Sequence, residues 1–213
     1  MTLRLKGQTS GYVELNAPAA AGSNTLTLPD GNGSAGQYLQ TNGSGTLSWQ
    51  TVTATGQINS ETAQTISGSP SAVSFTGLPA NIRRLVVTLN NVDPAGTELP
   101  IVQLGTSSGY KTSGYDSHGL WTYSTSQNVT SESTGFQIPW SGASSLHGAF
   151  ELQRHSANIF VCRSQIYIWD GSNVGITHQA GIVDLGGELE RVQLTIKGSD
   201  TYNGGSVNVH WEL

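Results

Sequence analysis

The chain has 213 residues, a formal net charge of −5 and only 11% charged residues, while glycine, serine and threonine occur 27, 26 and 23 times. This composition excludes a coiled coil and argues against a helical bundle, because these three small residues are weak helix formers. Nine basic residues in a mildly acidic chain predict no nucleic-acid partner. No apolar stretch approaches the length of a membrane span, which predicts no membrane insertion.

Residues 1–55 contain only short alternations of apolar and polar residues, separated by turn sequences. Four of them each predict one short strand, and they are centred on Leu3 and Leu5, Val13 and Leu15, Leu26 and Leu28, and Leu47 and Trp49. Asn42-Gly43 is typical of a hairpin turn. The segment has too few large apolar residues for a core of its own. Such a segment stays mobile, docks on a partner or shares a core with its own copies, and we expect residues 1–55 to be a β-rich attachment or oligomerisation segment.

In residues 56–213 the alternation is stronger, and it is cleanest in residues 192–196 and 207–213. Turn sequences separate the predicted strands, and they include Asp93–Gly96, Gly105–Gly109, Trp140–Ser145, Asp170–Asn173 and Asn203–Gly205. Short strands at this spacing, without a helical period, predict an antiparallel β-sandwich that resembles a jelly roll. The predicted fold is all-β, with a short N-terminal β-extension followed by this sandwich.

Two motifs that occur in enzymes are interpreted as turns. Residues 31–36 match G-x-G-x-x-G, but no helical pattern follows and no acidic residue occurs between this motif and Glu61. Residues 105–109 match G-x-S-x-G, but the sequence after them cannot form the helix that a nucleophile elbow requires. The five histidines lack the close pairing of a zinc site, and the acidic residues are scattered. We therefore predict no catalytic residue, no metal site, no cofactor and no enzymatic activity.

The single cysteine and the start of the chain bear on the cellular compartment. Cys162 excludes an intrachain disulfide, and its place in the apolar run 159–162 predicts a buried, unreactive thiol. The first residues lack the apolar core of a signal peptide. We therefore expect synthesis in the cytosol without secretion by the general route.

Aromatic residues in or beside polar loops give the one indication of a binding site. Exposed rings next to amides and carboxylates bind sugars, because the apolar face of a sugar stacks on the ring while the polar groups bind hydroxyls. The same rings could instead close the ends of the sandwich core or form an oligomer contact, so both interpretations stay open. The candidate glycan-contact residues are Tyr115, Trp121, Tyr123, Trp140 and Trp169.

Two parts of the chain resemble structural proteins of tailed bacteriophages, especially cyanophages. The N-terminal resemblance lies in residues 11–15, 17–29, 31–37 and 41–43, together with Trp49. The second half resembles the terminal β-sandwich domain of phage tail-fibre proteins, and its marks are residues 82–89, 103–109, 112–115, 134–136, 189–192, 198–200 and 204–209.

The resemblance implies a virion protein that is made in the host cytoplasm and forms a homotrimer. Its N-terminal part would bind other virion proteins of the tail or baseplate, and its sandwich would contact the host surface through a receptor or glycan. The expected function is that of a short trimeric tail fibre. Because the chain is short for a fibre and lacks a long repeat, a capsid decoration (cement) protein with a purely structural role is the alternative. A tailspike that cleaves glycans is a third possibility.

Overall fold

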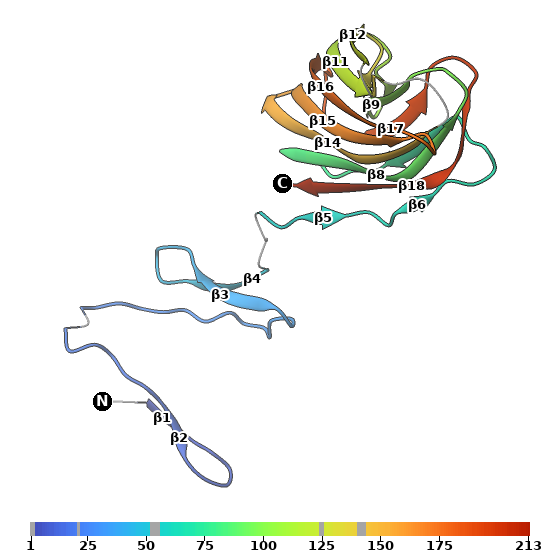
Figure 1. Cartoon of the computed structure of the whole chain (residues 1–213). Coiled ribbons are helices and arrows are strands. Elements are labelled where there is room, and N and C mark those ends of the chain that lie inside the picture. Colours follow the sequence, from blue (N-terminus) through green and yellow to red (C-terminus); the bar gives the residue numbers. More distant parts are fainter. Residues whose placement is uncertain (1–2, 21, 52–55, 124–125, 140–143) are drawn as a thin grey trace. The chain divides into compact units, whose positions relative to one another are not determined.

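The computed structural model describes residues 3–20, 22–51, 56–123, 126–139 and 144–213. The chain divides into two compact units, Met1–Ala54 and Thr55–Leu213. All regular elements of the described residues are strands, and the larger unit is an antiparallel β-sandwich (Figure 1), so the predicted fold class is confirmed. Within the described ranges there is no helix long and apolar enough to cross a membrane.

The N-terminal unit contains two β-hairpins. The first pairs β1 (Leu3–Lys6) with β2 (Tyr12–Leu15), and the second pairs β3 (Gln37–Thr41) with β4 (Leu47–Thr51). None of the described residues of this unit is buried. A unit without a buried side chain lacks the main contribution to folding free energy, so something else must stabilise it.

The predictions for this unit were partly right. Strands form around Leu3, Val13 and Leu47 as expected, and Gly43 has the positive φ of 81° that the predicted turn requires. The prediction of a strand at residues 26–28 is wrong, because these residues form only an isolated β-bridge, between Thr27 and Thr46. Strand β3 was not predicted, because polar residues dominate its sequence.

The larger sheet of the sandwich has nine strands in the order β12-β11-β16-β15-β14-β8-β18-β5, and β6 also pairs with β18. Every pair in it is antiparallel. The bounds are β5 (Asn59–Ser60), β6 (Gln64–Thr65), β8 (Arg84–Ala95), β11 (Tyr115–Tyr123), β12 (Ser126–Glu132), β14 (Ser145–Ser156), β15 (Ile159–Trp169), β16 (Val174–Asp184) and β18 (Thr201–Glu212).

The smaller sheet has five strands in the order β10-β9-β17-β7, with β13 also paired to β9. Its strands are β7 (Ala72–Thr76), β9 (Pro100–Thr106), β10 (Gly109–Tyr110), β13 (Phe136–Gln137) and β17 (Arg191–Ile196). A row of amides crosses this sheet: the Gln193 side chain donates to Gln103, which donates to the carbonyl oxygen of Thr134. This row explains how Gln103 can be buried without an unpaired polar group.

One apolar core lies between the inner faces of the two sheets. Strand β15 shows how the sequence builds this core. Its even-numbered residues from Phe160 to Ile168 are buried, and its odd-numbered residues from Val161 to Trp169 are exposed. This period of two is what a strand with one covered face requires. Burial of each large apolar side chain contributes about 1.5–3 kcal/mol, so the core stabilises this unit.

Two of the predicted turns lie inside strands. Residues 93–95 belong to β8, and residues 203–205 belong to β18. The pairing of β8 shifts register here against both β14 and β18, and Asn91 adopts a positive φ of 53°. These shifts are β-bulges, which use the same glycine and asparagine residues as turns do. Of the turn predicted at residues 140–145, residues 140–143 lie outside the described residues, and Ser145 already belongs to β14.

Candidate binding surface on the nine-stranded sheet

The outer face of the nine-stranded sheet, which points away from the core, carries the candidate site. Strand register places outward residues of neighbouring strands side by side. One row contains Leu120, His178, Gln165 and Ala149, from β11, β16, β15 and β14. Residues from distant parts of the sequence therefore form one continuous surface.

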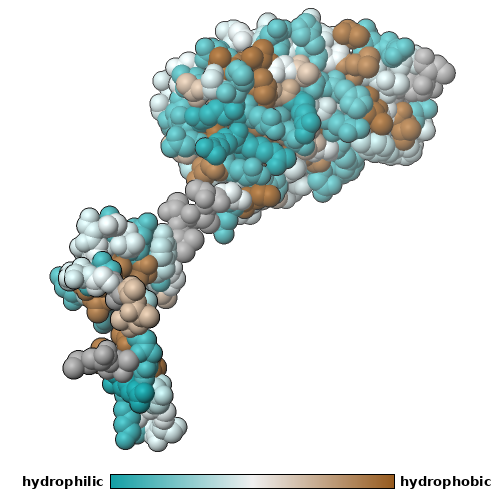
Figure 2. Space-filling view, turned by 90° about the vertical axis from the view of Figure 1, so that its left-hand side faces the viewer, coloured by the Kyte–Doolittle hydropathy of each residue, from teal (hydrophilic) through white to brown (hydrophobic). Residues whose placement is uncertain are grey.

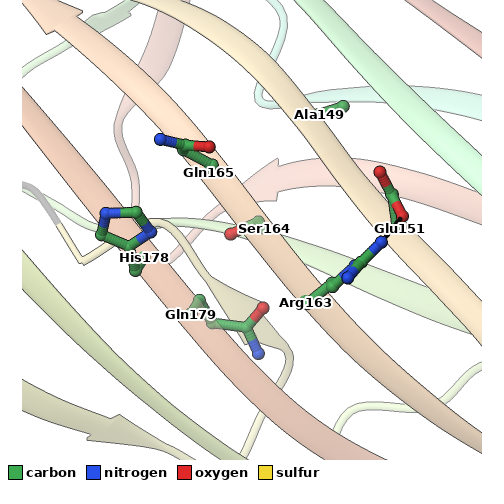
Figure 3. A pocket seen from close by; sticks show the side chains of 7 residues that line it. All are labelled: Ala149, Glu151, Arg163, Ser164, Gln165, His178 and Gln179. Carbon is green, nitrogen blue, oxygen red and sulfur yellow. Dashed lines mark hydrogen bonds and ion pairs between the residues drawn. The ribbon is translucent and has the colours of Figure 1, made fainter.

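A hollow of about 560 Å³ lies over β14, β15 and β16 (Figure 3), and we call it the polar groove. It is lined by Ala149, Glu151, Arg163, Ser164, Gln165, His178 and Gln179. Ala149 is directly opposite Gln165, so a small side chain lies beside a long one. This difference in side-chain size is consistent with a depression in an otherwise regular sheet surface.

Two side chains of the polar groove point toward each other in Figure 3 and form an ion pair. Arg163 Nη2 and Nε donate to Glu151 Oε2 at 2.7 and 3.1 Å. The hydrogen bonds from Arg163 lower the pKa of Glu151 and outweigh its partial burial, with further contributions from the charges of Arg163 and Arg84. Glu151 is therefore an ionised hydrogen-bond acceptor, suited to binding a hydroxyl and unsuited to donate a proton as a general acid.

Next to the polar groove lies a group of exposed apolar residues, which we call the apolar cluster. Trp169 is opposite Val174 and Tyr167 is opposite Ile176, and these side chains are 40–55% exposed. A second hollow of about 320 Å³ borders Tyr167, Val174 and Ile176. Figure 2 shows hydrophobic residues at the surface of both the sandwich and the N-terminal unit. Exposed apolar residues gathered in this way mark contact surfaces.

The position of the apolar cluster is fixed by its neighbours. The β15–β16 hairpin turns at residues 170–173, where the Asp170 carboxylate accepts hydrogen bonds from the backbone N–H groups of Ser172 and Asn173. The ring of His147 lies 5.9 Å from the ring of Tyr167, centroid to centroid. The backbone N–H of Asn91 donates to His147 Nδ1. The bulge in β8 therefore orients a ring that supports Tyr167.

Of the five predicted glycan-contact residues, the three whose side chains are described are not brought together. Trp169 is exposed in the apolar cluster, and Trp121 is half-buried on β11. Trp140 and the side chain of Tyr123 lie outside the described part of the chain. The prediction for Tyr115 is wrong.

Tyr115 lies in the core and is only 4% exposed. Its hydroxyl accepts a hydrogen bond from the backbone N–H of Leu104, and its ring meets Phe136 edge to face. Burial raises the pKa of its hydroxyl; the hydrogen bond to the Leu104 backbone lowers it by a smaller amount, and the charge interaction with Cys162 raises it slightly. A ring held in this way is not available for stacking on an external ligand.

Sequence reasoning missed the residues of the polar groove and also Tyr167. The missing signal is the outward set of β15, in which Arg163, Gln165, Tyr167 and Trp169 alternate with buried residues. Those four positions combine charge, amide and rings on one strand face. The alternation of apolar and polar residues predicted which side chains form the core. The residues between them, which form the opposite face of the strand, indicate the candidate site.

The other sequence motifs have structural roles. Cys162 is buried as predicted, its Sγ lies 3.5 Å from Gln179 Oε1, and burial raises the pKa of its thiol. A thiol with a raised pKa is a poor nucleophile. The G-x-S-x-G sequence forms the tight hairpin between β9 and β10, with Gly109 paired to Thr106.

No protein-family model, curated protein or solved structure matches the chain. What the outer face can do therefore follows from its own chemistry. The polar groove offers a carboxylate, a guanidinium, an imidazole and the exposed amide of Gln165, which together donate and accept hydrogen bonds. The apolar cluster adds exposed rings within the same strands. This combination can bind a ligand with many hydroxyl groups and apolar ring faces.

Proposed function

We propose that the protein is a non-enzymatic virion protein, a short homotrimeric tail fibre whose sandwich binds a glycan on the host surface. The observation that carries the proposal is the placement of Gln165 and Tyr167 at successive outward positions of β15. They lie about 7 Å apart along the strand, so one sugar chain can contact both. The resemblance to phage tail proteins supplies the biological setting.

In the proposed complex each part of the surface has a distinct task. Tyr167 and Trp169 present partly exposed rings for the apolar faces of sugars. Gln165 and His178 can donate to and accept from sugar hydroxyls. Glu151, already ionised and held by Arg163, accepts further hydrogen bonds. The arrangement binds without cleaving, since its carboxylate has a lowered pKa and would not protonate a leaving group.

The proposal is tested with fluorescent protein on intact host cells. We expect Tyr167→Ala and Gln165→Ala each to weaken binding by roughly tenfold, the effect of losing about 1.4 kcal/mol. Tyr12→Ala, which removes an exposed tyrosine of the other unit, is the matched control and leaves binding unchanged. Binding that survives enzymatic removal of the surface polysaccharide, or that the Tyr167 and Gln165 variants both retain in full, would overturn the proposal.

A capsid decoration protein is the second candidate, and the N-terminal unit favours it. A unit in which none of the described residues is buried suits docking on a capsid as well as on a tail. Gold-labelled antibody on assembled particles separates the two. Label on the tail supports the fibre, whereas label confined to the capsid would establish the alternative and remove the need for a glycan.

A further inference from the structure

The first hairpin of the N-terminal unit has one apolar and one charged face. Register pairs Leu3 with Leu15 and Leu5 with Val13, so four aliphatic side chains share one face. Their exposed fractions are 57–66%. We call these four residues the aliphatic face.

On the opposite face, the charged side chains of Arg4 and Glu14 find their partners within the hairpin. Arg4 forms an ion pair with Glu14, and its guanidinium lies over the ring of Tyr12, 4.6 Å from the centroid. Lys6 is the direct neighbour of Tyr12 across the strands. The charged face thus has its own partners and is suited to water, whereas the aliphatic face is not.

An isolated two-stranded hairpin is marginally stable at best, and a strand pair keeps a definite register only where one face is covered. Strict alternation in both strands of this hairpin therefore indicates a covered aliphatic face. Within the described residues of the unit, nothing is buried that could cover it. The cover therefore has to come from outside the described residues of this unit.

Charge favours a copy of the same chain over a partner of opposite charge. Residues 1–54 contain two basic residues, Arg4 and Lys6, and two acidic residues, Glu14 and Asp30. Because this unit is neutral, its copies do not repel one another and offer no field to attract a charged partner. The aliphatic face is also built from similar side chains on both strands, which suits packing on itself.

The required contact area is within reach of this unit. A stable interface buries about 800 Å² on each partner, more than four aliphatic side chains supply. Five more large apolar side chains of the same unit are exposed, namely Leu26, Leu28, Tyr38, Leu39 and Trp49. These side chains add exposed apolar surface within the same unit to that of the four aliphatic residues.

We infer that the aliphatic face of the β1–β2 hairpin is the contact through which copies of this chain associate, packing on the same face of the other copies. The inference rests on the homotrimer of the proposed function and names the surface that forms it. The hairpin, rather than the sandwich, then decides the oligomeric state. The charged face with Arg4 and Glu14 is left outside the contact.

The experiment compares two full-length double variants by light scattering and sedimentation. Leu5→Thr with Val13→Thr removes one apolar pair but keeps residues that favour strands. Lys6→Thr with Tyr12→Thr changes the same two strands on the charged face and is the matched control. For the wild type we expect three times the 22.4 kDa of one chain. The aliphatic-face variant should dissociate at concentrations roughly tenfold or more above the wild type, and the control should not.

The outcomes separate this inference from the proposed function. A trimeric wild type with an equally stable aliphatic-face variant overturns the hairpin contact and leaves the trimer standing. A wild type with the mass of one chain overturns both. If the two variants dissociate equally, the substitutions act by disrupting the hairpin and not through one of its faces, which overturns the inference. Thermal unfolding of the sandwich, which has its own core, serves as the folding control and should be unchanged.

Discussion

The two units of this chain use the same short strands and tight turns, yet only one of them has a core. In β15 the alternation of apolar and polar residues buries every second side chain, from Phe160 to Ile168. In β1 and β2 an equally strict alternation leaves Leu3, Leu5, Val13 and Leu15 exposed. Alternation therefore specifies a strand with two different faces, but burial depends on how many strands are present to cover the apolar one.

The largest expected effect comes from opening the core of the sandwich. Phe150 on β14 is fully buried, so Phe150→Ala removes a ring and leaves a cavity. We expect a loss of about 3–5 kcal/mol in the free energy of unfolding, measured in urea. Leu39→Ala, at an exposed position of β3, is the control and should leave the sandwich transition in place. Equal effects of the two substitutions would erase the contrast between the units.

A smaller effect is expected from the ion pair of the sandwich between the buried Glu132 and the partly exposed Lys197. Burial alone would raise the pKa of Glu132, but hydrogen bonds from Lys197 and Thr134 outweigh burial and lower it to about 2. Because the folded pKa lies below the ordinary value of 4.5, this contribution is present above about pH 4.5 and is lost as pH falls toward 2.

We therefore expect Glu132→Gln to destabilise the protein by about 2 kcal/mol at pH 7, a difference that shrinks toward zero near pH 2. Chemical denaturation at a series of pH values measures it. A difference that is the same at both ends of the series would show that Glu132 acts by packing and not by charge.

The smallest effect is expected from the ion pair of the N-terminal hairpin. Arg4 and Glu14 interact at the surface, where water and salt screen the charges. Arg4→Gln should change stability by less than about 0.5 kcal/mol and leave the oligomeric mass unaltered. Dissociation of the Arg4 variant in sedimentation runs would mean that the charged face takes part in association, and that the two faces differ less than the structure indicates.

Sequence patterns predicted the fold class and most strands of the sandwich, because the alternation in residues 192–196 and 207–213 is strong. They failed where one residue type serves two local structures. Gly204 and Gly205 were predicted to form a turn, but they accommodate bulges inside β18. A side chain at Gly205 would collide with the backbone of Asn91 on the neighbouring strand, a requirement visible only when the two strands are paired.

The candidate site was less predictable than the fold for a similar reason. Ala149, Gln165 and His178 come from three strands and meet only through register. A search for aromatic residues in polar loops found Trp169 at the edge of the site but also selected Tyr115, whose hydroxyl is satisfied by a backbone amide in the core. A polar neighbourhood in sequence does not reveal which face of a strand a ring occupies.

The position of β18 between β8 and the short strands β5 and β6 has a kinetic consequence. Thr88 and Asn208, bonded across the β8–β18 pair, are 120 residues apart in the chain. Contacts of such long range must wait for most of the polypeptide to collapse, which places folding in the millisecond-to-second range typical of sandwiches. During that interval the edge of β8 that β18 will cover is open to pairing with other chains, so slow closure of this one strand sets the period in which the protein is most exposed to aggregation.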